Sequence, residues 1–270
     1  MKDLRQSPEF AHFMEKIGWT VKKEKGVQIY IRHLPILGNF IKIQRPGVKI
    51  STGELENLAK KYKAFAIQLN YSPTKTLRLD LKKSEKEILK QMKKDCRYEI
   101  RKAEREKILV KQSLDIEAFV KIWHENAFKR GFWIPFGKEI RSIYRSFGRN
   151  AYLLLAYQQS SKPIAGALIL IFDKTAYYFY AASTSKGRKL SASYLVVFKA
   201  IKLAKRKGCK IFDFEGIYDE RSPIKSWQGF THFKKSFGGK EIEYPLSFTK
   251  FYNPFLKLAS KFFSKIPFFN

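Results

Sequence analysis

Cysteine and histidine are scarce in this sequence, and their scarcity excludes several classes of protein. The 270 residues include 2 cysteines, Cys96 and Cys209, and 4 histidines. There is no CxxC pair, so a disulfide scaffold is excluded. A structural zinc site, which needs closely spaced cysteine and histidine ligands, is not expected. We predict a protein of a reduced compartment that holds no metal.

Long apolar stretches are also absent. The longest run, residues 165–172, has the length of a strand and is followed by Asp173 and Lys174, whereas a helix that crosses a bilayer needs roughly 20 apolar residues. The segment MKDLRQSPEF at the start lacks the apolar core of a signal peptide. These features predict a cytoplasmic protein without a membrane-spanning helix.

Acidic residues are few relative to basic ones. Lys and Arg number 54 against 24 Asp and Glu, which gives a formal net charge of +30 at pH 7. Hydrophobic residues (44%) and aromatic residues (16%) are too frequent for a disordered chain. A folded protein with so positive a field attracts anions. The candidate partners are therefore nucleic acid, an anionic membrane and a phosphate-bearing substrate.

Strand and helix patterns alternate along the chain. Short strand-like runs separated by turn signals fill residues 1–81, interrupted by one helix at about 52–62. Further helices are predicted at about 115–129, 141–146 and 191–207, and further strands at 151–157, 166–172, 176–181 and 209–214.

A basic helix is predicted over residues 82–107. Ser84 and Glu87 have the spacing of a capping box, and neither Gly nor Pro interrupts the segment. Basic side chains surround its apolar stripe, so the helix is either a solvated face that aids solubility or a ridge that binds phosphate.

A polar basic loop, residues 183–190, joins a predicted strand to the helix at 191–207. Backbone N–H groups at a helix N-terminus, together with Arg188, form a ready anion-binding site. A basic surface loop that only connects two elements would have the same sequence, so both interpretations stay open.

Residues 250–270 have the pattern of a basic amphipathic helix. Lysines recur every four positions, as at Lys257 and Lys261, while Phe255 and Phe262 fall on the opposite side. Such a helix lies in a membrane interface or packs on its own domain. The membrane interpretation predicts that these four side chains contact an anionic bilayer.

The usual catalytic motifs are missing: no GxSxG, Walker-type, HExxH or GxGxxG pattern occurs. Asp213 stands near the end of the strand predicted at 209–214, so it is either a general base or a structural residue at the strand end. Lys234 lies between aromatic residues in the segment 233–239. It is either a fixed positive charge that faces a phosphate or a developing oxyanion, or part of an exposed turn.

Four segments stand out together. They are MKKDCRYEIRKAE at 92–104, the loop and helix from residue 182, FDFEG at 212–216, and GFTHFKKSFGG at 229–239. In this order they resemble the FemABX family, the aminoacyltransferases that build peptidoglycan interpeptide bridges. The resemblance covers about residues 82–248.

The resemblance implies an α+β fold of acetyltransferase-like (GNAT) domains, in which a mixed sheet is flanked by helices. We accordingly expect a truncated first domain at residues 1–81, a complete second domain at 82–249 that begins with the basic helix, and a C-terminal helix at 250–270. The pyrophosphate-loop pattern of acetyl-CoA enzymes does not appear at 183–192, which disfavours acetyl transfer.

The resemblance also implies an activity, the transfer of an amino acid from aminoacyl-tRNA to a stem-peptide amino group of a peptidoglycan precursor. The precursor is lipid-linked or UDP-linked, and no cofactor is expected besides the tRNA co-substrate. A tRNA, a pyrophosphate-bearing precursor and an anionic membrane would each favour a strongly basic protein. The expected location is cytoplasmic, with peripheral binding to the inner face of the plasma membrane.

Site residues follow from the same resemblance. Lys234 matches the lysine of an FKxxFGG-like motif, which implies contact with the precursor and polarisation of the reacting ester, and Asp213 is a candidate proton acceptor. The predicted substrate-binding residues are Phe233, Lys235, Arg188, Lys186 and Tyr180. The predicted tRNA or phosphate contacts are Arg97, Arg101, Lys102 and Lys94.

Two other functions fit the same sequence. One is a non-catalytic module that binds RNA or an anionic membrane. The other is a GNAT-type acyltransferase that uses another acyl donor.

Overall fold

The computed structural model describes residues 2–128, 137–159, 162–253 and 255–257. The chain forms two compact units. Unit 1 consists of Met1–Thr74 and Tyr244–Asn270, and unit 2 of Lys75–Glu243. The chain therefore leaves unit 1 once, completes unit 2 and returns.

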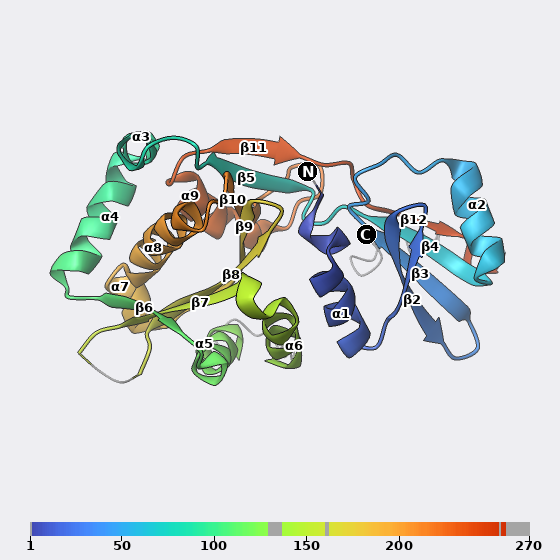
Figure 1. Cartoon of the computed structure of the whole chain (residues 1–270), viewed down its shortest axis with the longest axis horizontal. Helices are drawn as coiled ribbons and strands as arrows, with labels where there is room; N and C mark the ends of the chain where they lie inside the picture. Colours follow the sequence, from blue (N-terminus) through green and yellow to red (C-terminus); the bar gives the residue numbers. More distant parts are fainter. Residues whose placement is uncertain (1, 129–136, 160–161, 254, 258–270) are drawn as a thin grey trace. The chain divides into compact units, whose positions relative to one another are not determined.

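Unit 1 is built on a mixed five-stranded sheet with the strand order β1-β2-β3-β4-β12 (Figure 1). All neighbours in this sheet are antiparallel except β3 and β4, which are parallel and joined by α2. Ser51 and Glu54 form a capping box at the start of α2. The elements are α1 (Pro8–Lys16), β1 (Thr20–Glu24), β2 (Val27–Leu34), β3 (Gly38–Gln44), α2 (Thr52–Lys61), β4 (Ala64–Asn70) and β12 (Phe248–Phe251).

Unit 2 is built on a mixed seven-stranded sheet with the strand order β11-β5-β10-β9-β8-β7-β6. Only β9 and β10 are parallel, and α7 and α8 connect them. The elements are β5 (Lys75–Asp80), α3 (Glu85–Gln91), α4 (Lys94–Arg105), β6 (Leu109–Ser113), α5 (Ile116–Phe128), α6 (Gly137–Phe147), β7 (Ala151–Tyr157), β8 (Ala165–Phe172), β9 (Thr175–Ser183), α7 (Ser185–Lys189), α8 (Ala192–Arg206), β10 (Ile211–Gly216), α9 (Gln228–Lys235) and β11 (Lys240–Glu243).

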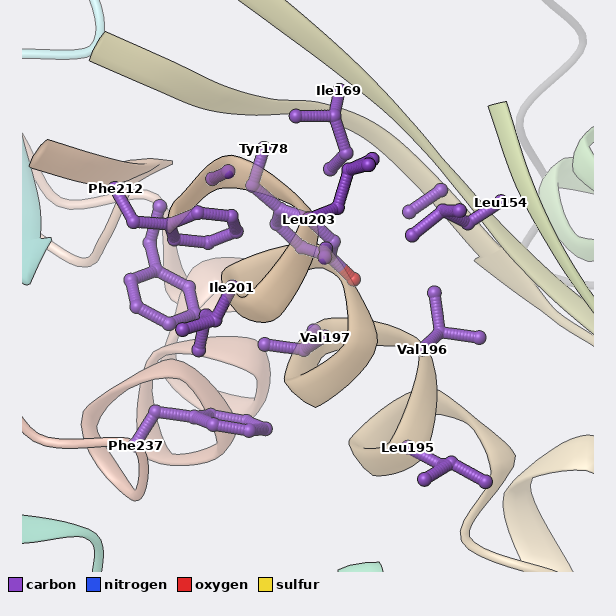
Figure 2. Close-up of a cluster of buried hydrophobic side chains, with 14 of the residues drawn as sticks. Leu154, Ile169, Tyr178, Leu195, Val196, Val197, Ile201, Leu203, Phe212 and Phe237 are labelled. Atoms are coloured by element: carbon purple, nitrogen blue, oxygen red, sulfur yellow. The ribbon is translucent and has the colours of Figure 1, made fainter. Parts of the chain in front are cut away.

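Helices cover both faces of the unit 2 sheet. Because successive side chains of a strand point to opposite faces, Leu154 of β7 packs in the cluster of α8, while Leu153 and Leu155 pack in the cluster of α5 and α6. Figure 2 shows the first cluster, with side chains of α8 facing those of the strands, such as Ile169 and Tyr178. This double cover explains why the central strands read as continuous apolar runs.

The helices expected at 52–62, 115–129 and 191–207 are confirmed as α2, α5 and α8, and the capping box at Ser84 and Glu87 is present. The sequence patterns did not predict α1, although Ser7 caps it and Pro8 stands at its first turn.

The single basic helix expected over residues 82–107 is wrong. The structure has two helices, α3 and α4, separated at Met92, whose backbone is extended (φ −68°, ψ 143°). Arg97 donates to the carbonyl oxygen of Met92 and, at 3.4 Å each, to those of Leu89 and Lys90. The backbone N–H of Lys93 donates to the carbonyl oxygen of Ser236 at 2.8 Å. A contact with a distant segment thus breaks a helix that local sequence favours.

The unit boundaries differ from those expected at residues 81/82 and 249/250. β5 pairs with β10 and β11, so residues 75–80 belong to unit 2. β12 pairs with β4 and returns the chain to unit 1. Residues 250 and 251 are thus strand, not the start of a helix, and of the predicted tail Phe262 and Lys261 lie outside the described residues.

Candidate functional site

A β-bulge at the end of β10 forms the centre of the candidate site. Asp213 pairs with Arg78 of β5, but the next pair is Gly216 with Thr76, so β10 holds one residue more than its partner over this stretch. Glu215, inside the bulge, has a left-handed backbone (φ +58°), which non-glycine residues adopt rarely. Bulges of this kind re-aim side chains and are frequent beside active sites.

The carboxylate of Asp213 holds the bulge in place. Oδ1 accepts hydrogen bonds from the hydroxyl of Thr76 and, at 2.8 Å, from the backbone N–H of Glu215. Oδ2 forms an ion pair of 2.8 Å with Nε of Arg78. The Asp213 side chain is fully buried. Burial raises its pKa, the negative charge of Glu215 adds to this, and Arg78 and Thr76 act in the opposite direction.

Lys234 of α9 reaches the same bulge. Its Nζ donates to the carbonyl oxygen of Gly216 at 2.6 Å and lies 4.9 Å from the ring centre of Phe230. Burial lowers the pKa of Lys234 from 10.5 to about 8, while the carboxylates of Glu215 and Asp213 limit the fall. Near neutral pH the side chain is therefore a cation in a poorly solvated place, and it is easily deprotonated above pH 8.

Two glycines bring α9 against the rest of unit 2. Gly238 and Gly239 follow α9 with φ values of +82° and +106°, which favour glycine. A Cβ at Gly238 would lie 2.9 Å from the carbonyl oxygen of Gln91, and one at Gly239 would lie 2.6 Å from that of Arg78. The FKxxFGG-like pattern is thus explained physically, because its glycines allow the close approach that carries Lys234 to the bulge.

The neighbours of Lys234 in sequence have different environments. Phe233 packs edge-on against Tyr194 and Phe237, with ring centres 4.8 and 5.4 Å away, and it anchors α9 on the core. Lys235 forms an ion pair with Glu241 of β11. The interpretation of residues 233–239 as an exposed turn is wrong, since α9 extends into the segment and the side chain of Phe237 is buried.

Arg188 and Lys186 lie in a short helix, α7, rather than in an open loop. The Arg188 guanidinium donates to the carbonyl oxygen of Ser183 at 2.6 Å and to Oγ of Ser185 at 3.1 Å. Gly187 packs so tightly that a Cβ there would lie 2.2 Å from the carbonyl oxygen of Ile164. Tyr180 of β9 packs on the α5 and α6 side of the sheet. No hydrogen bond or ion pair between these residues and Lys234 is found in the described part of the chain.

The four residues predicted to contact phosphate lie on α4, but they differ in exposure and in the groups that they already contact. Lys94 and Arg101 are exposed, Lys102 is 4.0 Å from Glu99, and Arg97 is occupied by the carbonyl groups at the end of α3. Arg97 therefore has a structural role that its place in a basic pattern did not reveal.

Sequence reasoning missed Thr76 and Arg78, which hold Asp213. Their spacing of two residues on a strand puts them on one face, which was the available signal. Only the pairing of β5 with β10, more than 130 positions later in the chain, shows that this face meets Asp213.

No helix among the described residues has the length and apolarity to span a membrane. The same residues contain no group of three or more His, Cys, Asp or Glu side chains placed to hold a metal ion.

A comparison with protein-family models identifies one family for this chain, and solved structures share its fold. A sequence model of the FemAB family matches residues 11–162 and 157–265, a longer stretch than the resemblance quoted above. No curated protein sequence matches. The crystal structure of FemX is similar over 98% of this chain and 94% of its own, with 16% identity and a TM-score of 0.79. The predicted GNAT-like α+β fold is confirmed.

Two further structures share the fold. One is the C-terminal domain of a protein described as a lysylphosphatidylglycerol synthetase from Agrobacterium fabrum, with 11% identity and a TM-score of 0.62 over 96% of this chain and 93% of its own. The other is L-PGS from Bacillus licheniformis, with 10% identity and a TM-score of 0.60 over 94% and 90%.

Proposed function

The chain belongs to the FemAB family, whose members are transferases of cell-wall synthesis, and from this premise we propose that it moves an amino acid from aminoacyl-tRNA to a peptidoglycan precursor. The acceptor is an amino group of the stem peptide, on a lipid-linked or UDP-linked precursor. The product is the precursor with the transferred amino acid attached, as the first or a later residue of an interpeptide bridge.

The observation that carries this proposal is the Lys234 cation beside the β10 bulge. In the transfer, the neutral acceptor amine attacks the ester carbonyl of the aminoacyl-tRNA. A C–N bond forms, the C–O bond to the tRNA ribose breaks, and the proton lost by the amine ends on the departing ribose oxygen. The carbonyl oxygen is negative in the tetrahedral intermediate, and a positive charge held in a poorly solvated place stabilises it strongly.

Asp213 serves this site as a positioning residue. Its oxygens already accept hydrogen bonds from Thr76, Glu215 and Arg78, and its side chain exposes no surface to a substrate. It holds the bulge that presents the Gly216 carbonyl to Lys234. Attack of an amine on an activated ester depends on orientation and oxyanion stabilisation, so the proposal needs no strong base at Asp213.

Exposed basic residues supply the surface for the tRNA donor. Lys94 and Arg101 project from α4, and Lys186 and Arg188 are exposed on α7. We therefore propose that Lys94 and Arg101 contact tRNA phosphates, whereas Arg97 acts through the fold. Phosphate contacts make affinity fall steeply with salt, by roughly one unit of log–log slope for each contact.

The proposal includes peripheral membrane binding through the last residues. Phe255 is 84% exposed and Lys257 is also exposed, as an interfacial segment requires. An acceptor carried on a lipid would be reached from this position on the inner face of the plasma membrane.

The deciding experiment follows a radiolabelled amino acid from a pool of charged tRNAs onto lipid-linked and UDP-linked precursors. We expect label on one precursor with the wild type, loss of at least about 100-fold in rate with Lys234→Ala, and partial recovery with Lys234→Arg. Lys240→Ala is the matched control, because Lys240 is an exposed lysine of β11 with no ion pair among the described residues. Its rate should equal that of the wild type.

Other outcomes identify the competing functions. Since one similar structure is described as a lysylphosphatidylglycerol synthetase, the assay includes phosphatidylglycerol as a second acceptor. Label found only there would overturn the peptidoglycan acceptor. No transfer, with salt-steep binding to any RNA, would favour a binding module. Transfer from an acyl-CoA without tRNA would favour a GNAT-type acyltransferase.

A further inference from the structure

The turn between β2 and β3 has an unusual backbone. The N–H of Leu37 donates to the carbonyl oxygen of Pro35 at 2.8 Å, and Ile36 between them has φ +71°. A hydrogen bond across one residue with positive φ is the γ-turn of the rare, strained kind. A β-branched residue is the least suited to it, because its Cβ substituents crowd the backbone.

The same turn exposes apolar surface. The segment Leu34, Pro35, Ile36, Leu37 is a run of four apolar residues at the tip of a hairpin. Ile36 is fully exposed and Leu37 is 41% exposed. Glycine or asparagine would adopt this positive φ with less strain and would expose less apolar surface to water. Isoleucine therefore destabilises the folded state both through its backbone and through its exposed side chain. A residue that conflicts with local structural preferences in this way is typical of a functional surface.

Basic residues flank this tip. β3 begins beside the start of β4, with Asn39 paired to Ala64, so the C-terminal end of α2 lies at the same end of the unit 1 sheet as the tip (Figure 1). A Cβ at Gly38 would lie 3.5 Å from the carbonyl oxygen of Lys63. Lys60 and Lys63 are exposed and form no ion pair with any described residue. The apolar tip is thus accompanied by free positive charge.

We propose that this tip, residues 34–37 with Lys60 and Lys63, inserts into the interface of an anionic membrane. Two or three exposed apolar side chains are too small an area for a stable protein interface, but they suffice for interfacial insertion when lysines bind the lipid headgroups. The net charge of +30 favours an anionic bilayer over a neutral one. This surface deepens the proposed function, on which its biological role rests, because it brings unit 1 to the membrane that carries a lipid-linked acceptor.

The test is sedimentation of the full chain with vesicles of phosphatidylcholine and phosphatidylglycerol, without precursor or tRNA. Ile36→Asn should lower the partition coefficient at least about tenfold, from the lost burial of one aliphatic side chain. It should also leave the melting temperature unchanged or raise it, since asparagine tolerates positive φ. Ile36→Trp should restore or strengthen binding. Opposite effects on binding and stability are not produced by a merely structural role.

A matched pair of lysines tests the charge. Lys63 and Lys25 both have φ +48° and are exposed, but Lys25 lies in the β1–β2 turn, at the other end of β2, and its charge is paired with Glu54 at 3.0 Å. Lys63→Asn should weaken binding about fivefold, and Lys25→Asn should leave it within twofold. Equal binding of the wild type and Ile36→Asn would overturn the proposal, as would self-association that this substitution abolishes. Because the assay holds no substrate, such a failure leaves the transfer reaction untouched, and failed transfer leaves the vesicle result standing.

Discussion

Burial of the Lys234 ammonium destabilises the folded protein, and replacing Lys234 by methionine removes this charge. The pKa of Lys234 falls from 10.5 to about 8, a shift of about 2.5 units, which corresponds to about 3 kcal/mol against the charged form in the folded state. Methionine has similar length but leaves the Gly216 carbonyl without the Nζ donor, which costs about 1–3 kcal/mol. We expect Lys234→Met to be as stable as the wild type at pH 7, or about 2 kcal/mol more stable, while transfer is lost.

The difference in stability between the wild type and Lys234→Met should also depend on pH. Because the folded pKa of Lys234 lies below the unfolded one, the unfolded wild type binds more protons between pH 8 and pH 10.5. The free energy of unfolding of the wild type therefore rises with pH in this window. The methionine variant lacks this rise, so the wild type should gain about 2–3 kcal/mol relative to the variant between pH 7 and pH 10.

Urea denaturation of both proteins at pH 7, 8.5 and 10 measures this difference, and comparison with the variant cancels the titration of all other groups. A constant difference across the three pH values would refute the argument, because it would mean that the Lys234 ammonium is well solvated. The activity has a related signature: transfer should decline above about pH 8 in the wild type, and Lys234→Arg should shift that decline to higher pH.

Three further substitutions test the framework of the site. Gly238→Ala should destabilise by about 2–4 kcal/mol from strain and overlap, whereas Gly208→Ala, also at positive φ but with open space around it, should cost only about 1 kcal/mol; thermal melts compare the two. Arg97→Met should cost about 1–2 kcal/mol by uncapping α3 with tRNA affinity changed less than twofold; a large affinity loss without destabilisation would contradict its structural role. Asp213→Asn leaves Arg78 without its anion, so kcat should fall with little change in KM for the precursor; an unchanged kcat would contradict the positioning role.

Local sequence determined most of the elements of unit 2. Strands of continuous apolar residues, such as 166–172, and helices with recognisable caps, such as the one at Ser84, are encoded within a few neighbouring residues, so pattern alone predicts them. The segment GFTHFKKSFGG likewise pointed to Lys234, because the lysine and the two glycines that allow the close approach of α9 all lie within one short stretch of sequence.

Tertiary structure decided what the sequence could not. The break between α3 and α4 depends on Ser236, and the cradle of Asp213 depends on Arg78, residues that lie more than 130 positions from their partners. Unit 1 is likewise completed by β12 from the other end of the chain. Sequence patterns reflect interactions between residues that are close along the chain, whereas these contacts depend on which strands become neighbours in the folded sheet. The sequence by itself therefore determined the family and the candidate lysine, and only the folded structure decided the groups that surround Lys234 and set its pKa.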